Sequence, residues 1–487
     1  MLPLKEKDKP VIQKLLSAGC CARCILRFCC VSVQAAYRQP HQGTLKELQA
    51  FISNTENTKS QDSTAAESAE GNNKSHDAAA SEPSEDPPSC KGECALKHSL
   101  RSHQHCHSIT LDVNVMFCPQ IAEAVKAEKY EFDTLVLSVS LPAQLCVREH
   151  SCWLHVKKEL REKSIALDKD DVIQVKEAFK WIMQGQVAKE LGGVAVVTRS
   201  VFTRMAVVKA LEKISDAKFL KHYPCPPAHP TSSCISQDIQ CLHVSVFVAG
   251  RYNKFCRSLP QTPWVIDGER RMESSVEELI AAAILSSFRA SGFNFSSSGR
   301  EDVDVRTLGN GRPFAMELLN PHRSRLNKVE MKQLQETINK SSDKIRVRDL
   351  QIVTREAMGR MKEGEEEKTK SYTALIWTQK PIQREDISFI DDIKDLTLDQ
   401  KTPLRVLHRR ALAVRQRVIH SMNTRFLDSH HFYLGLKTQA GTYIKEFVHG
   451  DFGRTKPNLC QLLNTDTDIL ELDVESVDVD WPPSIPE

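Results

Sequence analysis

An aspartate in a polar loop, with an arginine on each side, is the clearest candidate for chemistry in the sequence. It is Asp302, in the segment GREDVDVR at residues 299–306, where Arg300 and Arg306 are the neighbouring cations. Nearby cations favour the ionised form of a carboxylate, and an ionised carboxylate can serve as a nucleophile or as a base. The alternative is structural, because an aspartate in a polar loop is more often a turn former.

Two later segments offer aromatic and basic side chains that could act together with Asp302. Tyr372 stands at the start of the strand-like segment YTALIWT, and Tyr443 and Lys445 follow a glycine turn in KTQAGTYIKEF. A tyrosine at such a position is more often a core residue, so spacing alone does not decide the role of Tyr443.

Charge is segregated along the chain, although its total is close to zero. The 66 Lys+Arg and 63 Asp+Glu residues give a net charge of +3, which by itself does not require a nucleic-acid partner. From residue 401 to residue 425, however, the acidic residues are absent and seven residues are basic: Lys401, Arg405, Arg409, Arg410, Arg415, Arg417 and Arg425. In LAVRQRVIH, Arg415 and Arg417 are expected on the face opposite Val414 and Val418, where a row of guanidinium groups suits a phosphate backbone. A solvated polar face is the alternative explanation.

The patterns around these residues predict an α+β domain in the second half of the chain. Ser275 with Glu278 predicts the start of an amphipathic helix that stops near Gly292, and Asn327 with Glu330 predicts the start of a second one. VDVRTL and PFAMEL are expected to be two strands joined by a GNGR turn. Strand patterns recur in IRVRDLQIV, YTALIWT, LAVRQRVIH, FYLGLKTQ and ILELDVESVDVDW. Many strands with few helices predict a mostly antiparallel sheet.

The first half of the chain is patterned less clearly. Alternating apolar residues predict a strand at 133–141, and helical spacing predicts helices around LKELQAFI, at 170–183 and at 201–214. Residues 54–89 contain no Val, Ile, Leu or aromatic residue. Such a stretch cannot bury enough apolar surface to offset its conformational entropy, so it is predicted to be a disordered linker.

Several of these motifs together resemble a known family. GREDVDVRTLGNGRPF is similar to the catalytic motif of pseudouridine synthases, and GTYIKE is similar to a second motif of those enzymes. With GRYNKFCRSLPQTPW at 250–264 and KTPLRVLHRR at 401–410, the chain resembles the archaeal and eukaryotic tRNA pseudouridine synthases that act on T-loop uridines 54 and 55. The resemblance covers about residues 240–487 and is weaker in the first half.

The resemblance implies a fold and a set of roles. It implies a pseudouridine-synthase catalytic domain with a mostly antiparallel mixed sheet, preceded by a zinc-binding, THUMP-like α+β accessory domain. Asp302 would be the catalytic aspartate, Lys445 its basic partner, Tyr372 and Tyr443 the tyrosines that contact the base, and Arg300 a further substrate contact. The partner would be tRNA, and the isomerisation itself would need no metal or redox cofactor.

Cysteine is concentrated in the first half, where 15 of the 16 cysteines precede residue 257. Cys21 and Cys24 have the spacing of half a zinc site. The resemblance implies a second Cys-x-x-Cys pair beyond the linker, and this chain offers the wider pair Cys90 and Cys94, so these four cysteines are the predicted structural zinc ligands. The alternatives are that this region binds no metal or that other residues take part, namely Cys20, His103, Cys106 and His107.

These observations predict a division of the chain into an accessory part, a linker and a catalytic domain. Relative to the family, the accessory part is expected to lack a piece near residues 184–200, where the sequence joins abruptly. The predicted segments are 1–53 and 90–240 for the accessory domain, 54–89 for the linker and 241–487 for the catalytic domain.

Other classes of function fit less well. A non-catalytic RNA-binding adaptor remains the alternative, with Asp302 merely structural. A zinc deaminase would need a His-x-Glu motif with a downstream Pro-Cys-x-x-Cys, and a nucleotide-driven enzyme would need a phosphate-binding loop; both motifs are absent from the sequence. No apolar run approaches about 20 residues, and the charged start MLPLKEKDK does not resemble a signal peptide. We therefore expect an intracellular protein without a membrane span, in the nucleus, the cytoplasm or the mitochondrion.

Overall fold

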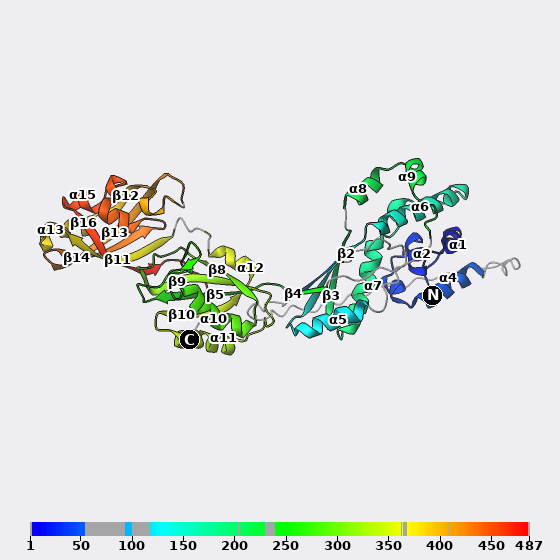
Figure 1. The fold of residues 1–487 in the computed structure, drawn as a ribbon, viewed down its shortest axis with the longest axis horizontal. Helices are drawn as coiled ribbons and strands as arrows, with labels where there is room; N and C mark the ends of the chain where they lie inside the picture. The colour runs from blue at the N-terminus through cyan, green and yellow to red at the C-terminus, as the bar shows by residue number, and fades with distance from the viewer. Residues whose placement is uncertain are drawn as a thin grey trace, which may run out of the picture. The chain divides into compact units, whose positions relative to one another are not determined.

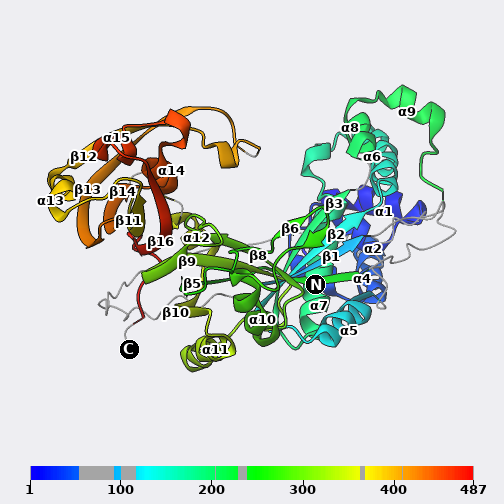
Figure 2. The ribbon, with the colours of Figure 1, turned by 60° about the vertical axis from the view of Figure 1, so that its left-hand side comes forward.

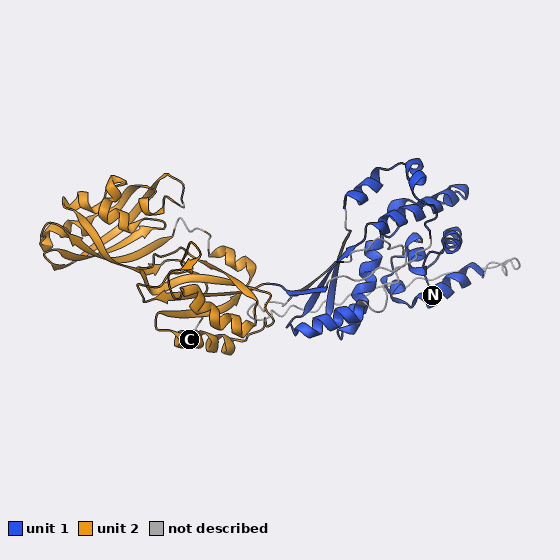
Figure 3. Ribbon diagram, in the orientation of Figure 1, with its two compact units in different colours: residues 1–244 blue, residues 245–487 orange. Residues whose placement is uncertain are grey.

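The computed structural model describes residues 2–53, 93–99, 117–202, 205–228, 239–361, 363, 368–408 and 410–485; for residues 93–99, 117 and 200–202 it describes the backbone alone. The predicted linker at 54–89, Cys90, His103, Cys106, His107 and Arg409 lie outside these ranges. Two compact units divide the chain, unit 1 at residues 1–244 and unit 2 at residues 245–487 (Figure 3).

Unit 1 is built on a four-stranded mixed sheet. Its strands are β1 (Glu93–Ser99), β2 (Thr134–Leu141), β3 (Ala195–Phe202) and β4 (Ile239–His243), in the order β3-β2-β1-β4. β2 is parallel to both β1 and β3, and β4 is antiparallel to β1. The predicted strand at 133–141 is confirmed as β2, in which every second residue from Leu135 to Leu141 is buried.

Helices of unit 1 share one apolar core with this sheet. They are α1 (Lys9–Ser17), α2 (Ala22–Phe28), α3 (Gln34–Arg38), α4 (His41–Ser53), α5 (Phe117–Glu128), α6 (Gln144–Glu162), α7 (Val175–Glu190), α8 (Met205–Lys213) and α9 (Asp216–His222), with 3-10 turns η1 (Glu6–Asp8) and η2 (Lys169–Asp171). α5 packs against β4 and α7 packs against β3 (Figure 1).

Two helices of unit 1 differ from the prediction. The helix expected at 170–183 begins at Val175, because the preceding acidic residues form the separate turn η2, and it continues to Glu190. The helix expected at 201–214 begins at Met205, because residues 201 and 202 complete β3. β3 pairs with β2 over its whole length, so residues 195–200 of the abrupt join belong to the sheet.

Unit 2 is built on a ten-stranded mixed sheet, which confirms the predicted α+β class with mostly antiparallel strands. Its path is β10-β5-β9-β16-β11-β14-β13-β12-β15, and β8 pairs with β9 off this path. β9 and β16 are parallel and the other pairs are antiparallel. The strands are β5 (Val246–Lys254), β8 (Gly292–Ser297), β9 (Arg306–Leu319), β10 (Ile345–Val353), β11 (Thr369–Thr378), β12 (Lys394–Lys401), β13 (Val414–Asp428), β14 (His431–Gln439), β15 (Thr455–Lys456) and β16 (Thr467–Val477).

The remaining elements of unit 2 are a small hairpin and short or amphipathic helices. They are β6 (Val265–Ile266), β7 (Glu269–Arg270), α10 (Val276–Phe288), α11 (Lys328–Ser341), α12 (Arg355–Arg360), α13 (Arg384–Ser388), α14 (Ile444–His449) and α15 (Leu459–Leu463), with η3 (Phe389–Asp392), η4 (Leu404–Val406) and η5 (Gly450–Gly453). α10 and α11 lie together on one face of β5, β9 and β10 (Figure 2).

The predicted helix starts are confirmed by cap geometry. The Ser275 side chain accepts from the backbone N–H of Glu278, and Asn327 forms a reciprocal capping box with Glu330. α10 ends before Gly292, because Arg289 adopts the left-handed conformation with φ 48° and terminates the helix.

The expected GNGR turn is wrong, because β9 runs through these residues as one strand. Gly309 has φ +51°, and a Cβ there would lie 1.9 Å from the carbonyl oxygen of Glu475 on β16. Gly311 has φ +72°, and a Cβ there would lie 2.9 Å from the carbonyl oxygen of Tyr252 on β5. Both glycines therefore permit close approach of neighbouring strands and do not reverse the chain.

Candidate active site

The loop at residues 298–305, which joins β8 to β9, carries Asp302 and is called the catalytic loop below. The Asp302 carbonyl oxygen accepts from the backbone N–H of Val305 at 3.1 Å, so the loop turns directly after the aspartate. The side chain of Asp302 is 35% exposed. It is therefore held by the protein and still open to a ligand.

Two cations contact the Asp302 carboxylate. Arg405 Nη1 lies 3.2 Å from Oδ1 and 3.1 Å from Oδ2, and Lys445 Nζ lies 3.4 Å from Oδ2. Lys445 is thus placed where the sequence predicted a basic partner. Arg405 was predicted as a member of the basic stretch and of the motif KTPLRVLHRR but not as a partner of Asp302, and η4 brings it to the aspartate from 103 positions along the chain.

Arg300 and Arg306 do not supply the charge at Asp302 that their spacing suggested. Arg306 forms a bidentate ion pair with Asp473, because it lies where β9 pairs with β16. Arg300 is exposed, and its charge acts on Glu277 at the start of α10, where it opposes the rise in the pKa of Glu277 that burial causes.

Asp304 holds Lys445 more closely than Asp302 does. Lys445 Nζ donates to Asp304 Oδ1 at 2.9 Å and to Oδ2 at 2.7 Å. Burial would raise the pKa of Asp304, but the hydrogen bonds and charge of Lys445 outweigh burial and hold this pKa below its ordinary value. Lys445 therefore bridges two carboxylates of the same loop.

Arg405 is shared in the same way. Its Nε lies 2.6 Å from Glu446 Oε1, while its Nη1 contacts Asp302. Burial would lower the pKa of Arg405, but the hydrogen bond and charge of Glu446 raise it. Three carboxylates and two cations alternate in the order Glu446, Arg405, Asp302, Lys445 and Asp304.

The main chain of the catalytic loop is held by a buried lysine. Lys254, at the end of β5, has no exposed surface, and its Nζ donates to the carbonyl oxygens of Leu259 at 2.8 Å, Asp302 at 3.2 Å and Val303 at 2.8 Å. Burial lowers the pKa of Lys254, and the charge of Glu301 opposes this effect. Three carbonyl dipoles take the place of a carboxylate partner for this cation.

Glu301 anchors the same loop through its side chain. Its carboxylate lies 2.7 Å from Arg312 Nε, and the Tyr252 hydroxyl donates to it at 2.8 and 3.0 Å. Gln261 Nε2 donates to the Tyr252 hydroxyl oxygen at 2.7 Å and to the carbonyl of Gly299 at 3.1 Å. The residue before Asp302 is therefore part of a buried polar network.

Tyr443 lies beside this cluster, at the start of α14. Its backbone N–H donates to Gln400 Oε1 at 2.9 Å, and its carbonyl accepts from Gln400 Nε2 at 3.0 Å. Arg410 Nη1 donates to its hydroxyl at 3.4 Å, and the guanidinium carbon of Arg405 lies 6.0 Å from the ring centroid. The half-buried ring thus has a fixed backbone and cationic neighbours.

Tyr372 lies on β11, where it pairs with Leu436 of β14 and Val474 of β16. Burial raises the pKa of Tyr372, and the charge of Arg312 opposes this effect. Arg312 also pairs with Glu301, so Tyr372 is connected to the catalytic loop through this arginine.

Arg415 and Arg417 lie on the face of β13 opposite Val414, as predicted, but this is the more buried face of the strand at its start. Val414 is 59% exposed, whereas Arg415 and Arg417 are half-buried on the same face as buried Ile419. Arg415 pairs with Gln400, the residue that holds Tyr443. Arg417 lies against Gly441, where a Cβ would be 3.3 Å from its Nε. The arginines occupy this face because it carries the polar turn that leads into α14.

Three of the four predicted zinc ligands, Cys21, Cys24 and Cys94, lie among the residues that the structure describes. Cys21 and Cys24 are buried at the start of α2, and Cys21 Sγ accepts from the Cys24 backbone N–H at 3.4 Å. Cys94 is the second residue of β1, and the structure describes its backbone alone. Cys20 Sγ, one of the alternatives, lies 3.6 Å from Cys152 Sγ. Within the described ranges, no group of three or more His, Cys, Asp or Glu residues is arranged to hold a metal.

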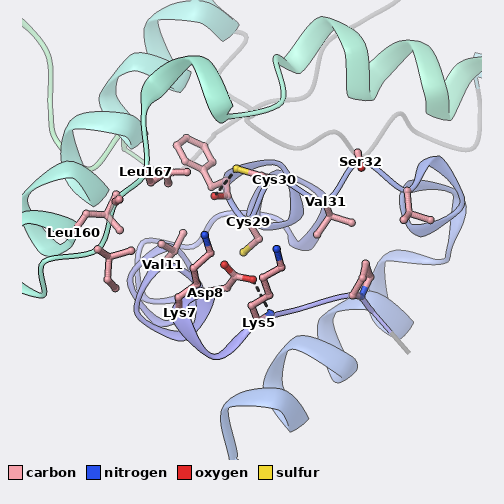
Figure 4. Close-up of a pocket in the computed structure, with 15 residues that line it drawn as sticks. Lys5, Lys7, Asp8, Val11, Cys29, Cys30, Val31, Ser32, Leu160 and Leu167 are labelled. Carbon is pink, nitrogen blue, oxygen red and sulfur yellow. Dashed lines mark hydrogen bonds between the residues drawn. The ribbon is translucent and has the colours of Figure 1, made fainter. Parts of the chain in front are cut away.

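A separate pocket of about 250 Å³ lies in unit 1 (Figure 4). Its polar lining includes Lys5, Lys7, Asp8, Cys29 and Cys30. Burial raises the pKa of both thiols, and nearby acidic residues add to the effect. The predicted site residues do not line this pocket, so it is distinct from the cluster around Asp302.

Three residues of the cluster were not predicted from the sequence as members of the ion-pair network around Asp302: Asp304, Arg405 and Glu446. Asp304 lies two residues after Asp302, Glu446 directly follows Lys445, and Arg405 lies in KTPLRVLHRR. The motifs were therefore the available signal, although only the fold reveals which side chains meet. In the part of the chain that the structure covers, no helix has the length and apolarity needed to cross a bilayer.

Comparisons with known proteins point to one family. A family model described as "Pus10, C-terminal" matches residues 247–478, and one described as "Eukaryotic Pus10, N-terminal" matches residues 106–202 and 197–241. The chain is 53% identical over 538 residues to the tRNA pseudouridine synthase Pus10 of Mus musculus, and 53% identical over 532 residues to that of Homo sapiens. Both alignments cover 100% of this chain and 100% of the relative.

More distant similarities cover less of the chain. The tRNA pseudouridine synthase Pus10 of Pyrococcus furiosus is 37% identical and matches 47% of this chain and 58% of its own. A crystal structure of a Cbf5-Nop10-Gar1 complex matches 47% of this chain and 48% of that chain, with 15% identity and a TM-score of 0.26.

Proposed function

The chain belongs to the Pus10 family of tRNA pseudouridine synthases, and from this membership we propose that Asp302 isomerises uridine in the T-loop of tRNA, at position 54, 55 or both. Membership in a family of isomerases favours an enzyme over the alternative, a non-catalytic RNA-binding adaptor. The observation that carries the proposal is the environment of Asp302, a partly exposed carboxylate in contact with Arg405 and Lys445.

The reaction is an isomerisation, so bonds are rearranged and no atoms are lost, and a carboxylate can promote it. The C1′–N1 bond of uridine breaks, the uracil turns, and a new bond joins its C5 to C1′. The proton on C5 leaves to a base, and N1 ends with a proton. Asp302 would act as the nucleophile or the base, and Arg405 and Lys445 would stabilise its negative charge between steps.

The target base has to leave its stack to reach Asp302, and aromatic and basic groups can receive it. Tyr443 and Tyr372 are the proposed contacts to the base, and Arg300, exposed beside Asp302 in the chain, is a proposed contact to the substrate. Arg415 and Arg417, near the turn that carries Tyr443, are suited to the phosphate backbone of the same RNA.

Replacement of the carboxylate tests this proposal. Asp302→Asn should abolish pseudouridine formation in a tRNA transcript incubated with pure protein, while the affinity for tRNA stays near that of the wild type. Mapping of pseudouridine at each T-loop position would also decide between positions 54 and 55. Asp343→Asn, in the exposed turn between α11 and β10, is the matched control and should keep full activity. Activity retained by Asp302→Asn would overturn the assignment.

For unit 1 we propose a THUMP-like accessory role in tRNA binding, with a structural zinc held by Cys21, Cys24, Cys90 and Cys94. The first pair supports this, because Cys21 is the N-cap of α2 and its Sγ accepts from the N–H of Cys24, so both cysteines lie in one turn with the spacing of half a zinc site. A nuclear or cytoplasmic location, where tRNA is matured and used, belongs to the same proposal.

Metal analysis of the full chain, purified without chelator, tests the zinc site. We expect one zinc per chain, and Cys21→Ser or Cys24→Ser should lose it and lower the thermal stability of unit 1, because structural zinc contributes directly to folding. Cys256→Ser in unit 2 is the control and should keep the metal. A wild-type protein without zinc would exclude the site without affecting the assignment of Asp302.

A further inference from the structure

Arg405 connects two carboxylates that differ sharply in burial. Its Nε and Nη2 face Glu446, at 2.6 and 3.5 Å from the two carboxylate oxygens, and its Nη1 reaches Asp302. The side chain of Glu446 is 2% exposed, whereas that of Asp302 is 35% exposed. One edge of the guanidinium group is therefore occupied inside the protein, and the remaining nitrogen is directed at the reacting carboxylate.

The position of Glu446 is fixed by its helix. Glu446 lies in the first turn of α14, and the next residues, Phe447 and Val448, are completely buried where α14 packs against β16. A buried carboxylate without a partner is costly. The planar guanidinium fork matches a carboxylate in a set orientation, so the direction of Nη1 follows from the position of Glu446.

We propose that Glu446 is a positioning residue that holds Arg405 against Asp302 in the geometry required for isomerisation. This inference rests on the proposed catalytic role of Asp302. Successive residues of α14 then serve the same carboxylate by two routes, Lys445 by direct contact and Glu446 through Arg405. Because its side chain is only 2% exposed, Glu446 should affect the rate of the chemical step and leave the affinity for tRNA unchanged.

A double-mutant cycle in the full-length protein tests this relay. Arg405→Gln should lower the single-turnover rate constant for pseudouridine formation about 10²-fold, as small displacements of catalytic groups can, and Glu446→Gln should lower it about tenfold. Because Glu446 acts through Arg405, the double variant should be no slower than Arg405→Gln alone. The dissociation constant of Glu446→Gln for tRNA should equal that of the wild type.

Controls separate this inference from a fault in folding and from the assignment of Asp302. Glu336→Gln, an exposed i,i+4 partner of Lys340 on α11, should leave the rate unchanged. If Glu446→Gln does not fold, Glu446→Asp keeps the charge, and its rate should lie between those of the wild type and Arg405→Gln. Multiplicative losses in the double variant, or a wild-type rate in folded Glu446→Gln, would overturn the proposal. An active Asp302→Asn protein would instead remove the premise.

Discussion

The two halves of the unit 2 sheet contribute to the candidate site in different ways. The first half, residues 245–353, holds Asp302 through buried groups: Lys254 has no exposed surface, and the side chains of Glu301 and Arg312 are 0% and 3% exposed. The second half, residues 368–485, supplies more exposed groups, with Arg405 at 39% and Lys445 at 19%. The carboxylate is therefore fixed on a rigid loop, and its cations come from segments nearer to solvent.

The halves meet along a short ladder. β9 and β16 pair in parallel at residues 306–307 and 473–474, and Asp473 accepts from Arg306 and also pairs with Arg257 at 2.8 Å. The close approach of Gly309 to the carbonyl of Glu475 continues this contact. We therefore expect substitutions in the first half to change the stability of the catalytic loop. We expect substitutions in the second half to change the binding of tRNA or its turnover.

The largest effect is expected from the buried ion pair of the first half. Arg312→Met leaves the Glu301 carboxylate buried without its cation, which costs about 3–5 kcal/mol of unfolding free energy. Urea denaturation, combined with hydrogen exchange of peptides from residues 245–353, measures this loss. Arg271→Met removes an exposed pair with Glu269 and should cost at most about 1 kcal/mol. Both pairs lie in the first half, so equal costs for the two variants would contradict the role of the buried Arg312–Glu301 pair as the anchor of the catalytic loop.

A smaller effect on stability and a larger one on catalysis are expected from Tyr443 in the second half. Tyr443→Ala removes a ring that can stack on a base, a contact worth about 1–3 kcal/mol, so kcat/KM should fall about 10- to 100-fold. Tyr443→Phe keeps the ring and loses only the long hydrogen bond from Arg410, and its kcat/KM should fall less than about tenfold.

The backbone contacts of Tyr443 provide the control for this prediction. Both hydrogen bonds with Gln400 involve the main chain of Tyr443, so α14 should begin normally in the alanine variant and the melting temperature should change little. Alanine and phenylalanine variants with the same kcat/KM would show that the ring does not contact the base.

The sequence predicted the parts of this site that lie within continuous motifs. Asp302, Tyr443 and Lys445 were assigned because each stands in a short motif that resembles a motif of the pseudouridine synthases. Glu301 lies in the motif of Asp302, and Lys254 lies in the separate motif at residues 250–264, but their roles depend on contacts between strands that local spacing does not encode. The pairing of Arg405 with Glu446 likewise joins residues 41 positions apart.

The fold was predictable where periodicity decides and was mispredicted where backbone geometry decides. The alternation of apolar residues was sufficient to predict strand β2, and the capping box was sufficient to predict the start of helix α11. The GNGR segment contains residues typical of turns, yet its glycines serve close strand contacts inside β9. Arg415 and Arg417 lie opposite Val414 as predicted, but their half-burial was not foreseen, because the rule that apolar residues face inward fails beside a polar site.

The smallest effect is expected from the basic strand, and it compares the two halves directly. Arg417, against the Gly441 turn of the second half, is suited to a phosphate, whereas Arg346 is exposed on β10, the edge strand of the first half. Arg417→Gln should weaken tRNA binding a few-fold. It should also make the negative slope of log affinity against log salt concentration less steep by about 1, because one phosphate contact is lost. Arg346→Gln should leave the slope unchanged. Titrations of labelled tRNA at several salt concentrations measure both slopes, and a lower slope for Arg346→Gln alone would place the RNA on the first half of the sheet.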